Sequence, residues 1–417
     1  MMQIVLFEDD QVGRLEPITL ARPAYAIRCG TLRLIDLVAE LGQSLRGLVR
    51  PHLRDIQRLD NPQLQSSAGG SAEPQLLVNA RLVPSVENYR VLERLVAERR
   101  PTMVGRGDCL AAALLPPGSP SPGDDWEAGS LREFLARLSG FAPADTAVNC
   151  DLFEYPHDVV RYHLRVMQAA LERRLARGNY RELADGVFAA GEVGLHASVI
   201  TDTRGGPIVL EAGAQVGPFS LLTGPIHLGA GARVNPHSVL KTHVALGNQA
   251  RIGGEVAATI VESYSNKQHF GYLGHSYLGS WVNLGAGTTN SDLKNTYGDV
   301  QVESGSQRLT TGMQFFGCII GDYTKSAIHT GIFTGKMIGA CSTLYGYVTT
   351  NVPSFVNYAR LFGQVSEIPA AVVVATQQRM FRRRDVAQRP CDVQLIHDMY
   401  QLTRGERQQL TAQPLQL

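Results

Sequence analysis

Aliphatic residues recur at every sixth position through the middle of the chain. The spacing is strict from Leu210 to Ile252, and the residue four places after each aliphatic one is small or branched. A fixed period of this kind predicts stacked short strands, because one repeat cannot bury its apolar side alone and must pack on its neighbours. The phase returns at Leu278 and again from Ile320 to Thr350. The pattern therefore predicts a left-handed parallel β-helix over about residues 187–352, with interruptions.

Small or flexible residues directly follow several of these aliphatic positions. They are Gly217, Gly229, Asn235, Gly247 and Gly253. We expect them at the corners of the triangular coil, since Gly and Asn tolerate left-handed backbone angles at low cost.

The first 185 residues lack the six-residue period and alternate strand-like and helix-like segments. Strands are predicted at 4–10 (IVLFEDD) and 75–83 (QLLVNARLV), and helices at 31–45 and 131–141. Such alternation predicts an open α/β layer. Segments rich in Pro, Gly and Ser, which indicate loops, lie at 61–74 and 116–125.

Helical patterns flank the predicted β-helix. One covers 159–175, and two more follow residue 353, where the period ends. We therefore expect three parts: an α/β domain at 1–185, a β-helix at 186–352 and a helical segment at 353–417.

Composition excludes several classes of partner and compartment. The net charge is +1 and only 18% of residues are charged, so neither nucleic acid nor an anionic membrane surface is indicated. No apolar run is long enough to span a membrane, and the amino terminus lacks a secretory signal pattern. The six cysteines are scattered singly, with no zinc spacing. We expect a cytoplasmic protein with reduced thiols.

The segment 264–297 is dense in His, Asn, Lys and Tyr where the period is only partly kept. Its His269 is a candidate general base for an attacking amine or hydroxyl, since imidazole is the side chain used most often for proton transfer near neutral pH. Tyr272 is a candidate donor to a developing oxyanion, and Asn283 a candidate orienting residue. Lys267 or Lys294 would bind a sugar phosphate. The alternative is that His269 and Tyr272 only decorate a loop.

Two motifs in this segment resemble a known family. HFGYLG (269–274) and NLGAGT (283–288) are similar to the acetyltransferase domain of the bifunctional N-acetylglucosamine-1-phosphate uridyltransferase/glucosamine-1-phosphate acetyltransferase family. The resemblance implies His269 as the base, Tyr272 and Asn283 at the amino sugar, and Ala286 where acetyl-CoA enters. The family has Asn-Tyr-Asp-Gly after GAGT, whereas this chain has TNSDLKN, so Asn290 and Lys294 are expected as substitutes.

The amino-terminal part is similar to a divergent branch of that family. IVLFEDD (4–10), LEPITLARP (15–23) and RCG (28–30) carry the resemblance, which implies a nucleotidyltransferase-like, Rossmann-like domain of the GT-A type. The usual Gly-rich loop that cradles nucleotide phosphates is absent. Residues of suitable chemistry remain as candidate phosphate ligands, since guanidinium forks pair with phosphate: Arg14, Arg22 and Arg28, with Thr19 as a hydroxyl donor. Surface or salt-bridge roles for these arginines are the alternative.

Nucleotidyl transfer needs a divalent ion beside carboxylates. Asn79 and Arg81 stand where the ordinary relatives have an acid, so Asn79 is assigned to the nucleotide and the magnesium ligands are expected among other acids. The candidate ligands are Asp9 and Asp151, with Asp10, Asp108 and Asn149 as further possibilities.

The sequence thus predicts a sugar-nucleotide enzyme, a homotrimer. It would transfer acetyl from acetyl-CoA to an amino-sugar phosphate on the β-helix, and UTP or dTTP would supply the nucleotidyl group in the first domain. Alternatives are an acetyltransferase whose first domain only binds or regulates, and a γ-type carbonic anhydrase, disfavoured because His237 and His243 fall on different sides of the coil. The basic run RMFRRR (379–384) is either a solvated helix face or a contact for a coenzyme A phosphate.

Overall fold

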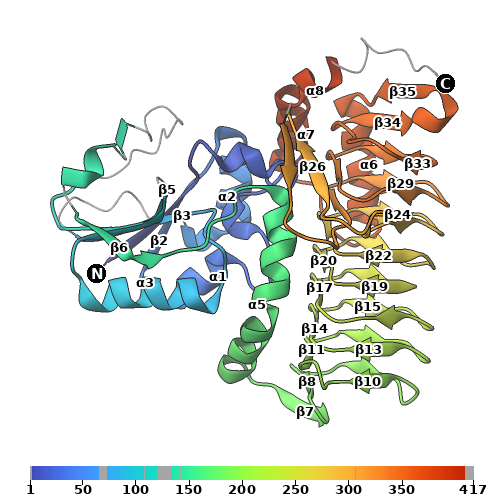
Figure 1. The fold of residues 1–417 in the computed structure, drawn as a ribbon, viewed down its shortest axis with the longest axis horizontal. Helices are drawn as coiled ribbons and strands as arrows, with labels where there is room; N and C mark the ends of the chain where they lie inside the picture. Colours follow the sequence, from blue (N-terminus) through green and yellow to red (C-terminus); the bar gives the residue numbers. More distant parts are fainter. Residues whose placement is uncertain are drawn as a thin grey trace. The chain divides into compact units, whose positions relative to one another are not determined.

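The computed structural model describes residues 2–64, 73–107, 109–120, 133–134, 136–140, 142–305 and 307–408. The chain divides into two compact units, Met1–Tyr155 and Pro156–Leu417. In Figure 1 the first unit runs from blue to green and the second from green to red.

Unit 1 is the predicted open α/β layer. Its sheet has the strand order β2-β1-β3-β5-β4-β6. The strands β2, β1 and β3 are parallel, β5 is antiparallel to β3 and β4, and β6 is parallel to β4. Their bounds are β1 (Gln3–Phe7), β2 (Ser44–Leu48), β3 (Gln75–Asn79), β4 (Thr102–Arg106), β5 (Cys109–Leu115) and β6 (Ala144–Asn149).

The helices of unit 1 only partly follow the sequence prediction. The expected helix at 31–45 is confined to α1 (Leu34–Ala39), because Gly42 takes a left-handed φ of 65° and the chain then enters β2. The expected strand at 75–83 ends at Asn79. The remaining helices are α2 (Arg54–Asp60) and α3 (Val86–Glu98), the latter capped by the Ser85 side chain. The helix expected at 131–141 and Asp108 lie partly or wholly outside the described residues.

Unit 2 is built on a parallel β-helix, which confirms the main prediction from the six-residue period. Side 1 of the coil comprises β8 (Val187–Ala189), β11 (Ile208–Leu210), β14 (Ile226–Leu228), β17 (Val244–Leu246), β20 (Ile260–Val261), β23 (Tyr277–Leu278), β28 (Cys318–Ile320) and β31 (Lys336–Ile338). Side 2 comprises β9 (Gly194–Leu195), β12 (Gln215–Val216), β15 (Arg233–Val234), β18 (Arg251–Ile252), β21 (Asn266–Lys267), β24 (Asn283–Leu284), β29 (Lys325–Ser326), β32 (Thr343–Leu344) and β34 (Val356–Ala359).

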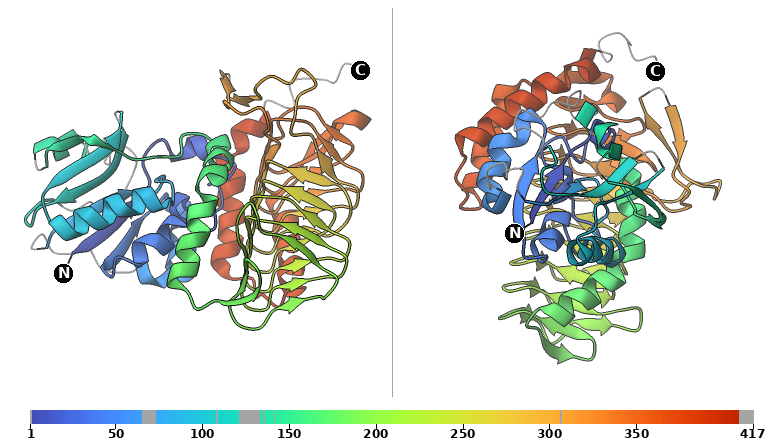
Figure 2. Two further views of the ribbon diagram at one scale, coloured as in Figure 1. Left: turned by 60° about the horizontal axis from the view of Figure 1, so that its bottom comes forward. Right: turned by 90° about the vertical axis from the view of Figure 1, so that its left-hand side faces the viewer.

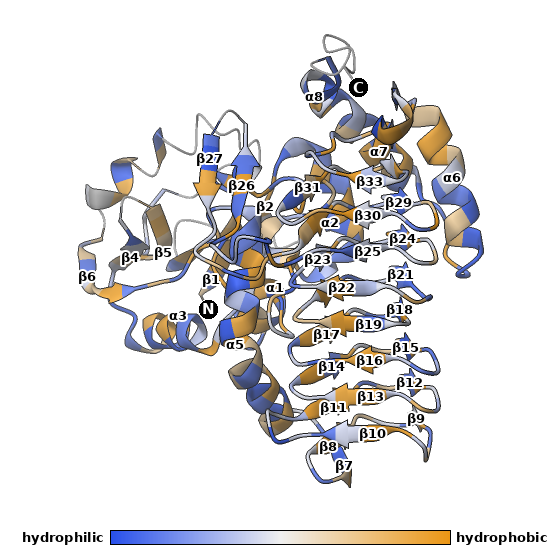
Figure 3. Ribbon diagram, turned by 45° about the vertical axis from the view of Figure 1, so that its right-hand side comes forward, coloured by the Kyte–Doolittle hydropathy of each residue, from blue (hydrophilic) through white to orange (hydrophobic). Residues whose placement is uncertain are grey.

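Side 3 is interrupted once. Its strands are β10 (Ile200–Asp202), β13 (Leu221–Thr223), β16 (Val239–Leu240), β19 (Glu255–Ala257) and β22 (Tyr272–Gly274), and then β25 (Thr289–Asn290), β30 (Gly331–Ile332) and β33 (Tyr347–Val348). Between β25 and β28 the chain leaves the coil and forms a hairpin of β26 (Gln301–Ser304) and β27 (Gln307–Thr310). The aliphatic residues predicted from Leu210 to Ile252 fill the interior of the coil, and several of their strands have the hydrophobic colour in Figure 3.

The glycines at the corners have a different role from the expected one. The left-handed residues lie two places further on, at Phe219, Gly231 and His237 for example. Gly229 and Gly253 are needed because successive coils approach closely: a Cβ at Gly253 would lie 2.1 Å from the Gln268 carbonyl oxygen. The prediction of left-handed angles at these glycines is therefore wrong, although their place at the corners is right.

Helices cover two sides of the coil. Helix α5 (Pro156–Arg177) packs Met167 and Leu171 on Val209 and Ala245 of side 1. The predicted terminal helices are α6 (Ala370–Arg382) and α7 (Pro390–Leu402), followed by α8 (Arg404–Gln408). Figure 2 shows α6, in red, running beside the stacked strands. One antiparallel strand ends each of two sheets: β7 (Arg181–Ala184) pairs with β8 on side 1, and β35 (Gln364–Glu367) pairs with β34 on side 2.

Two general expectations can be compared with the structure. None of the helices in the described ranges is both long and apolar enough to cross a membrane. All six cysteines are free thiols.

Candidate functional sites

Unit 1 has a cavity of about 980 Å³ at the carboxyl ends of β1 and β3. In sheets of this kind ligands bind at that edge. The polar residues that line the cavity are Asp9, Asp10, Gln11, Asn79, Asp145, Thr146 and Asn149. Of the predicted ligands, Asp9 and Asn79 line it.

Asp9 is already paired inside the protein. Its carboxylate accepts hydrogen bonds from Arg81 Nε at 2.7 Å, from Arg81 Nη2, and from Asn79 Nδ2 at 2.8 Å. Arg81 is fully buried and also donates to the Phe153 carbonyl. Burial alone would lower the pKa of Arg81, but the hydrogen bond to Asp9 and its negative charge raise that pKa above the usual value. The carboxylate that was expected to hold magnesium thus forms an ion pair with the Arg81 guanidinium.

The other predicted phosphate ligands of unit 1 do not line the cavity. Thr19 is buried and donates its hydroxyl to the Val12 carbonyl, and Arg28 is buried and donates to the Thr31 carbonyl. Arg14 is exposed and approaches Gln11, which does line the cavity. The expectation that Thr19 and Arg28 bind phosphate at this cavity is therefore corrected, because both side chains are buried outside its lining and donate to backbone carbonyls.

Two more predicted residues lie elsewhere in unit 1. The carbonyl of Arg22 accepts from Arg50, and the Asp151 carboxylate lies 3.9 Å from Arg106. Neither residue lines the cavity. Asp10, Asp145 and Asn149 do, so the structure moves the acidic groups of the site to β6 and the end of β1.

In unit 2, His269 lies at the corner between sides 2 and 3, where its side chain is exposed. Ala286 lies at the same corner one coil further on. Asn283 is exposed on the outer face of side 2, three residues before that corner. The predicted residues thus share one edge of the coil, with Asn283 and Ala286 on the coil that follows His269.

Lys267 is buried in the interior column of side 2. Its ammonium donates to the carbonyls of Gly253, at 2.8 Å, and His269, at 3.0 Å. Burial lowers the pKa of Lys267 to about 8. The expectation that Lys267 binds a sugar phosphate is corrected: it fixes the backbone of His269 from inside.

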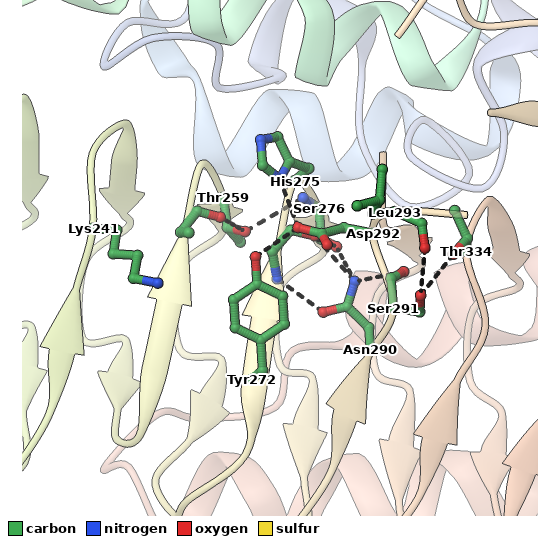
Figure 4. A network of polar contacts seen from close by, with 12 residues as sticks. Lys241, Thr259, Tyr272, His275, Ser276, Asn290, Ser291, Asp292, Leu293 and Thr334 are labelled. Atoms are coloured by element: carbon green, nitrogen blue, oxygen red, sulfur yellow. Dashed lines mark hydrogen bonds and ion pairs between the residues drawn. The ribbon is translucent and has the colours of Figure 1, made fainter. Parts of the chain in front are cut away.

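Tyr272 belongs to a polar network at the opposite end of β22 (Figure 4). Asp292 Oδ2 accepts from the Tyr272 hydroxyl at 2.6 Å and from His275 Nδ1 at 2.7 Å. Burial and the hydrogen bond to Asp292 raise the pKa of Tyr272 well above its usual value. Burial would raise the pKa of Asp292, but the bonds from His275 and Tyr272 hold it below the usual value. Because the Tyr272 hydroxyl donates its proton to Asp292, it is not available as a donor to a developing oxyanion.

Asn290 and Lys294 have structural partners. Asn290 occupies the interior column, where its amide accepts from the Gly274 N–H at 2.8 Å and donates to the Gly274 carbonyl at 3.0 Å (Figure 4). These two side-chain hydrogen bonds take the place of backbone hydrogen bonds between β22 and β25. Lys294 Nζ donates to the Asp299 carbonyl at 2.6 Å. Asn290 as a substrate ligand is corrected, since its polar atoms are used within the coil.

Sequence reasoning missed His275 and Asp292. The imidazole stacks on Phe315 at a centroid distance of 5.3 Å and is partly exposed. Because Nδ1 faces a carboxylate, it must donate, which leaves Nε2 as an acceptor in the neutral ring. This is the geometry of an oriented base.

The fold and these sites define an α/β domain with a cavity and a parallel β-helix in one chain. Residues 4–176 match the family model described as "Sugar nucleotidyl transferase". A curated relative is the "Bifunctional sugar-1-phosphate nucleotidylyltransferase/acetyltransferase" of Sulfurisphaera tokodaii, 30% identical over 97 residues, which are 23% of this chain and 24% of the relative. The matched part is thus about a quarter of the relative's length.

Solved structures similar to this chain include two further proteins. The UDP-N-acetylglucosamine acyltransferase of Francisella novicida is 12% identical over 52% of this chain and 78% of its own, with a TM-score of 0.20. The acetyltransferase domain of PglB from Neisseria gonorrhoeae is 12% identical over 61% and 94%, with a TM-score of 0.19. At such TM-scores the fold assignment rests on this chain's own parallel sheets.

Proposed function

We propose that the protein is a two-site transferase of sugar-nucleotide synthesis. Unit 1 transfers a nucleotidyl group from a nucleoside triphosphate, UTP or dTTP, to a sugar 1-phosphate. The β-helix transfers acetyl from acetyl-CoA to the amine of an amino-sugar phosphate. The observation that carries the proposal is the match of residues 4–176 to sugar nucleotidyl transferases, together with the cavity at the carboxyl ends of β1 and β3.

The cavity residues fit a metal that arrives with the nucleotide. Mg²⁺ is usually held by one or two carboxylates plus substrate phosphates. Of the cavity carboxylates, Asp9 is paired to Arg81 and Asp145 lies 3.6 Å from Arg94, so Asp10 is the one that would hold it. When bound, the ion would neutralise charge on the phosphates. Asn79 keeps Asp9 and the backbone of Arg81 in place, since its Oδ1 accepts from the Arg81 N–H.

On the β-helix, His269 takes the proton of the attacking amine. The nitrogen then bonds to the thioester carbon, the C–S bond breaks, and the proton passes to the departing thiolate. Lys267 supports this step by holding the His269 carbonyl. Asn283 and Ala286 offer the adjoining surface of the next coil for the acceptor and the donor.

A homotrimer suits the surface of unit 2. Large apolar side chains are exposed on or near the corner that carries His269: Phe219, Phe270, Ile328 and Phe362 are each more than half exposed. Exposed apolar patches of this kind mark protein interfaces. We expect partner subunits to cover this corner and so to complete the site. Cytoplasmic location fits substrates of this class.

A second candidate function keeps only the acetyl transfer. The buried Arg81–Asp9 pair favours it, because it removes one carboxylate from the metal site of unit 1. In that case unit 1 binds a nucleotide or sugar nucleotide without turning it over.

Release of coenzyme A thiol separates the classes of acceptor. We expect thiol release with glucosamine 1-phosphate and none with N-acetylglucosamine 1-phosphate, whose nitrogen is already acylated. Equal release with both compounds would mean that a hydroxyl, not the amine, is acylated, and no release with any sugar phosphate would refute acyl transfer.

Stability should depend on pH through Lys267. Its folded-state pKa of about 8 lies below the ordinary 10.5, so the unfolded chain binds more protons between those values. Stability from this group therefore rises as pH increases from about 8 towards 10.5. Lys325 shifts in the same direction, so the quantity to measure is the difference between wild type and Lys267→Met in denaturant unfolding across that range. Parallel pH profiles for the two proteins would contradict a buried, charged Lys267.

A further inference from the structure

The outer face of side 2 carries two arginines and an asparagine in one column. Arg233, Arg251 and Asn266 are in register on the adjacent parallel strands β15, β18 and β21. Their neighbours Val234, Ile252 and Lys267 point into the core, so by alternation these three side chains point outward. Adjacent strands are about 4.8 Å apart, which places the two guanidinium groups and the amide side by side.

The end of α6 brings two more arginines to this column. Buried Phe381 lies 4.4 Å from Trp281, which in turn stacks on Tyr264 at 4.4 Å, and this aromatic stack fixes the helix end on the coil. Just beyond it, Arg384 Nη2 donates to Asn266 Oδ1 at 2.7 Å. The hydrophilic end of α6 beside β18 and β21 is visible in Figure 3. Arg384 thus lies one strand away from Arg251.

The cluster of Arg233, Arg251, Arg383 and Arg384 is not neutralised by the protein. Within the described ranges none of the four forms an ion pair with a carboxylate, whereas Arg174 and Arg407 of the same unit pair with Glu211 and Glu367. Burial, and then Arg251, Arg383 and Arg233, lower the pKa of Arg384 to about 10. Burial, and then Arg233 and Arg383, lower the pKa of Arg251. The fold holds like charges together at a cost that a bound anion would remove.

We propose that these four arginines form a binding site for the phosphate group of a small ligand, either a diphosphate or a phosphate monoester. Guanidinium forks bind phosphate oxygens through paired, charge-assisted hydrogen bonds. Asn266 holds Arg384 in place and is otherwise a neutral member of the site. This assigns a role to the run 379–384 that the proposed transferase chemistry does not use.

The position of the site leaves two sources for the phosphate. Asn266 on β21 precedes His269, at the corner that follows this strand, by three residues, which span at most about 10 Å of chain. A substrate bound at His269 can therefore reach the arginines with a phosphate, and a free diphosphate can also occupy them as a regulator. The chemistry of recognition is the same in both cases.

The direct test is calorimetric titration of the full chain with inorganic pyrophosphate. We expect Arg251→Gln and Arg384→Gln each to weaken binding by ~10-fold or more, since each removes a charged hydrogen-bonding group. Arg308→Gln, at an exposed arginine of the hairpin, is the matched control and should bind as wild type does. Pyrophosphate that binds all three variants as tightly as wild type, or does not bind wild type, overturns the site.

Thermal unfolding gives a second readout that does not depend on catalysis. In phosphate-free buffer Arg251→Gln should melt at a higher temperature than wild type, because it relieves repulsion, while the rise that pyrophosphate causes in wild type should shrink. A lower melting temperature with an undiminished pyrophosphate effect would count against the proposal.

Kinetics distinguish the two sources and keep this test separate from that of the proposed function. If a substrate supplies the phosphate, Arg251→Gln raises its KM with kcat unchanged. If free diphosphate is the ligand, KM is unchanged and the effect of pyrophosphate on the rate is lost. Both outcomes support the site, and calorimetry reports on it even if the chain has no acetyltransferase activity.

Discussion

Replacing His269 with alanine should lower acetyl transfer to glucosamine 1-phosphate by ~10²-fold or more, the usual range for the loss of a general base. The side chain is exposed at its corner, so the change should leave the fold and the nucleotidyl transfer of unit 1 unaffected. The measurement is kcat/KM for thiol release, with nucleotide-sugar formation followed in the same preparations.

His237→Ala is the matched control for this variant. His237 is also exposed at the corner between sides 2 and 3, two coils earlier, where it stacks on Phe219. We expect it to retain full acetyl transfer. Activity that survives His269→Ala would contradict the assignment.

The paired imidazole of His275 supplies the sharpest alternative. His275→Asn keeps a hydrogen-bond donor for Asp292. Asn also tolerates the left-handed φ of 47° at this position. It removes the imidazole nitrogen that would accept the proton. Loss of activity in this variant, with activity retained in His269→Ala, would move the base to His275.

Arg81→Leu should destabilise unit 1 by ~3–5 kcal/mol, because removing one partner of a buried pair leaves an uncompensated charge. Arg81 is fully buried and the Asp9 side chain is 10% exposed, so the carboxylate left behind would be largely removed from water. The Phe153 carbonyl also loses its donor. Denaturant unfolding of the full chain, followed by a probe in unit 1, measures the change.

Arg94→Leu is the control in the same unit. Arg94 lies 3.6 Å from Asp145 in a pair whose side chains are 43% and 31% exposed. Exposed pairs of this kind contribute at most ~1 kcal/mol. If Arg81→Leu lowers the free energy of unfolding no more than Arg94→Leu does, the buried pair does not stabilise this edge of the sheet. Replacing both Arg81 and Asp9 with apolar residues should recover part of the loss.

The six-residue period determined most of unit 2, because packing of the interior column depends only on local spacing. The same period also contained a signal for Lys267. Val261, Lys267 and Leu273 are six residues apart, and all three are buried in the interior. Following that shifted phase would have placed the lysine inside the coil. Lys267 was expected to bind a phosphate because of its residue type alone, which does not show whether the side chain points into or out of the coil.

The Tyr272–Asp292–His275 network was beyond the sequence pattern. Asp292 belongs to the segment that leaves the coil after β25, and its distance from His275 depends on how that segment turns back. No period or spacing rule fixes such a turn. Asn290, by contrast, follows Leu278 and Leu284 at intervals of six residues, so the period itself placed its side chain inside the coil.

The Arg81–Asp9 pair was within reach of sequence reasoning. Phe7 and Asn79 are in register at the ends of the neighbouring parallel strands β1 and β3, and each strand is followed two residues later by a charged group. Opposite charges at equal distances beyond paired strand ends meet at the same edge. Treating Arg81 only as the replacement of a metal-binding acid missed that it would attract Asp9.

The central claim is that one chain carries two transferase activities. The most direct measurement is mass spectrometry of the products after the full chain is incubated with glucosamine 1-phosphate, acetyl-CoA, magnesium and UTP or dTTP, with each donor omitted in turn. We predict an acetylated sugar phosphate that requires acetyl-CoA alone, and an acetylated nucleotide sugar that requires both donors. A sugar phosphate recovered unchanged from the complete mixture would contradict the account.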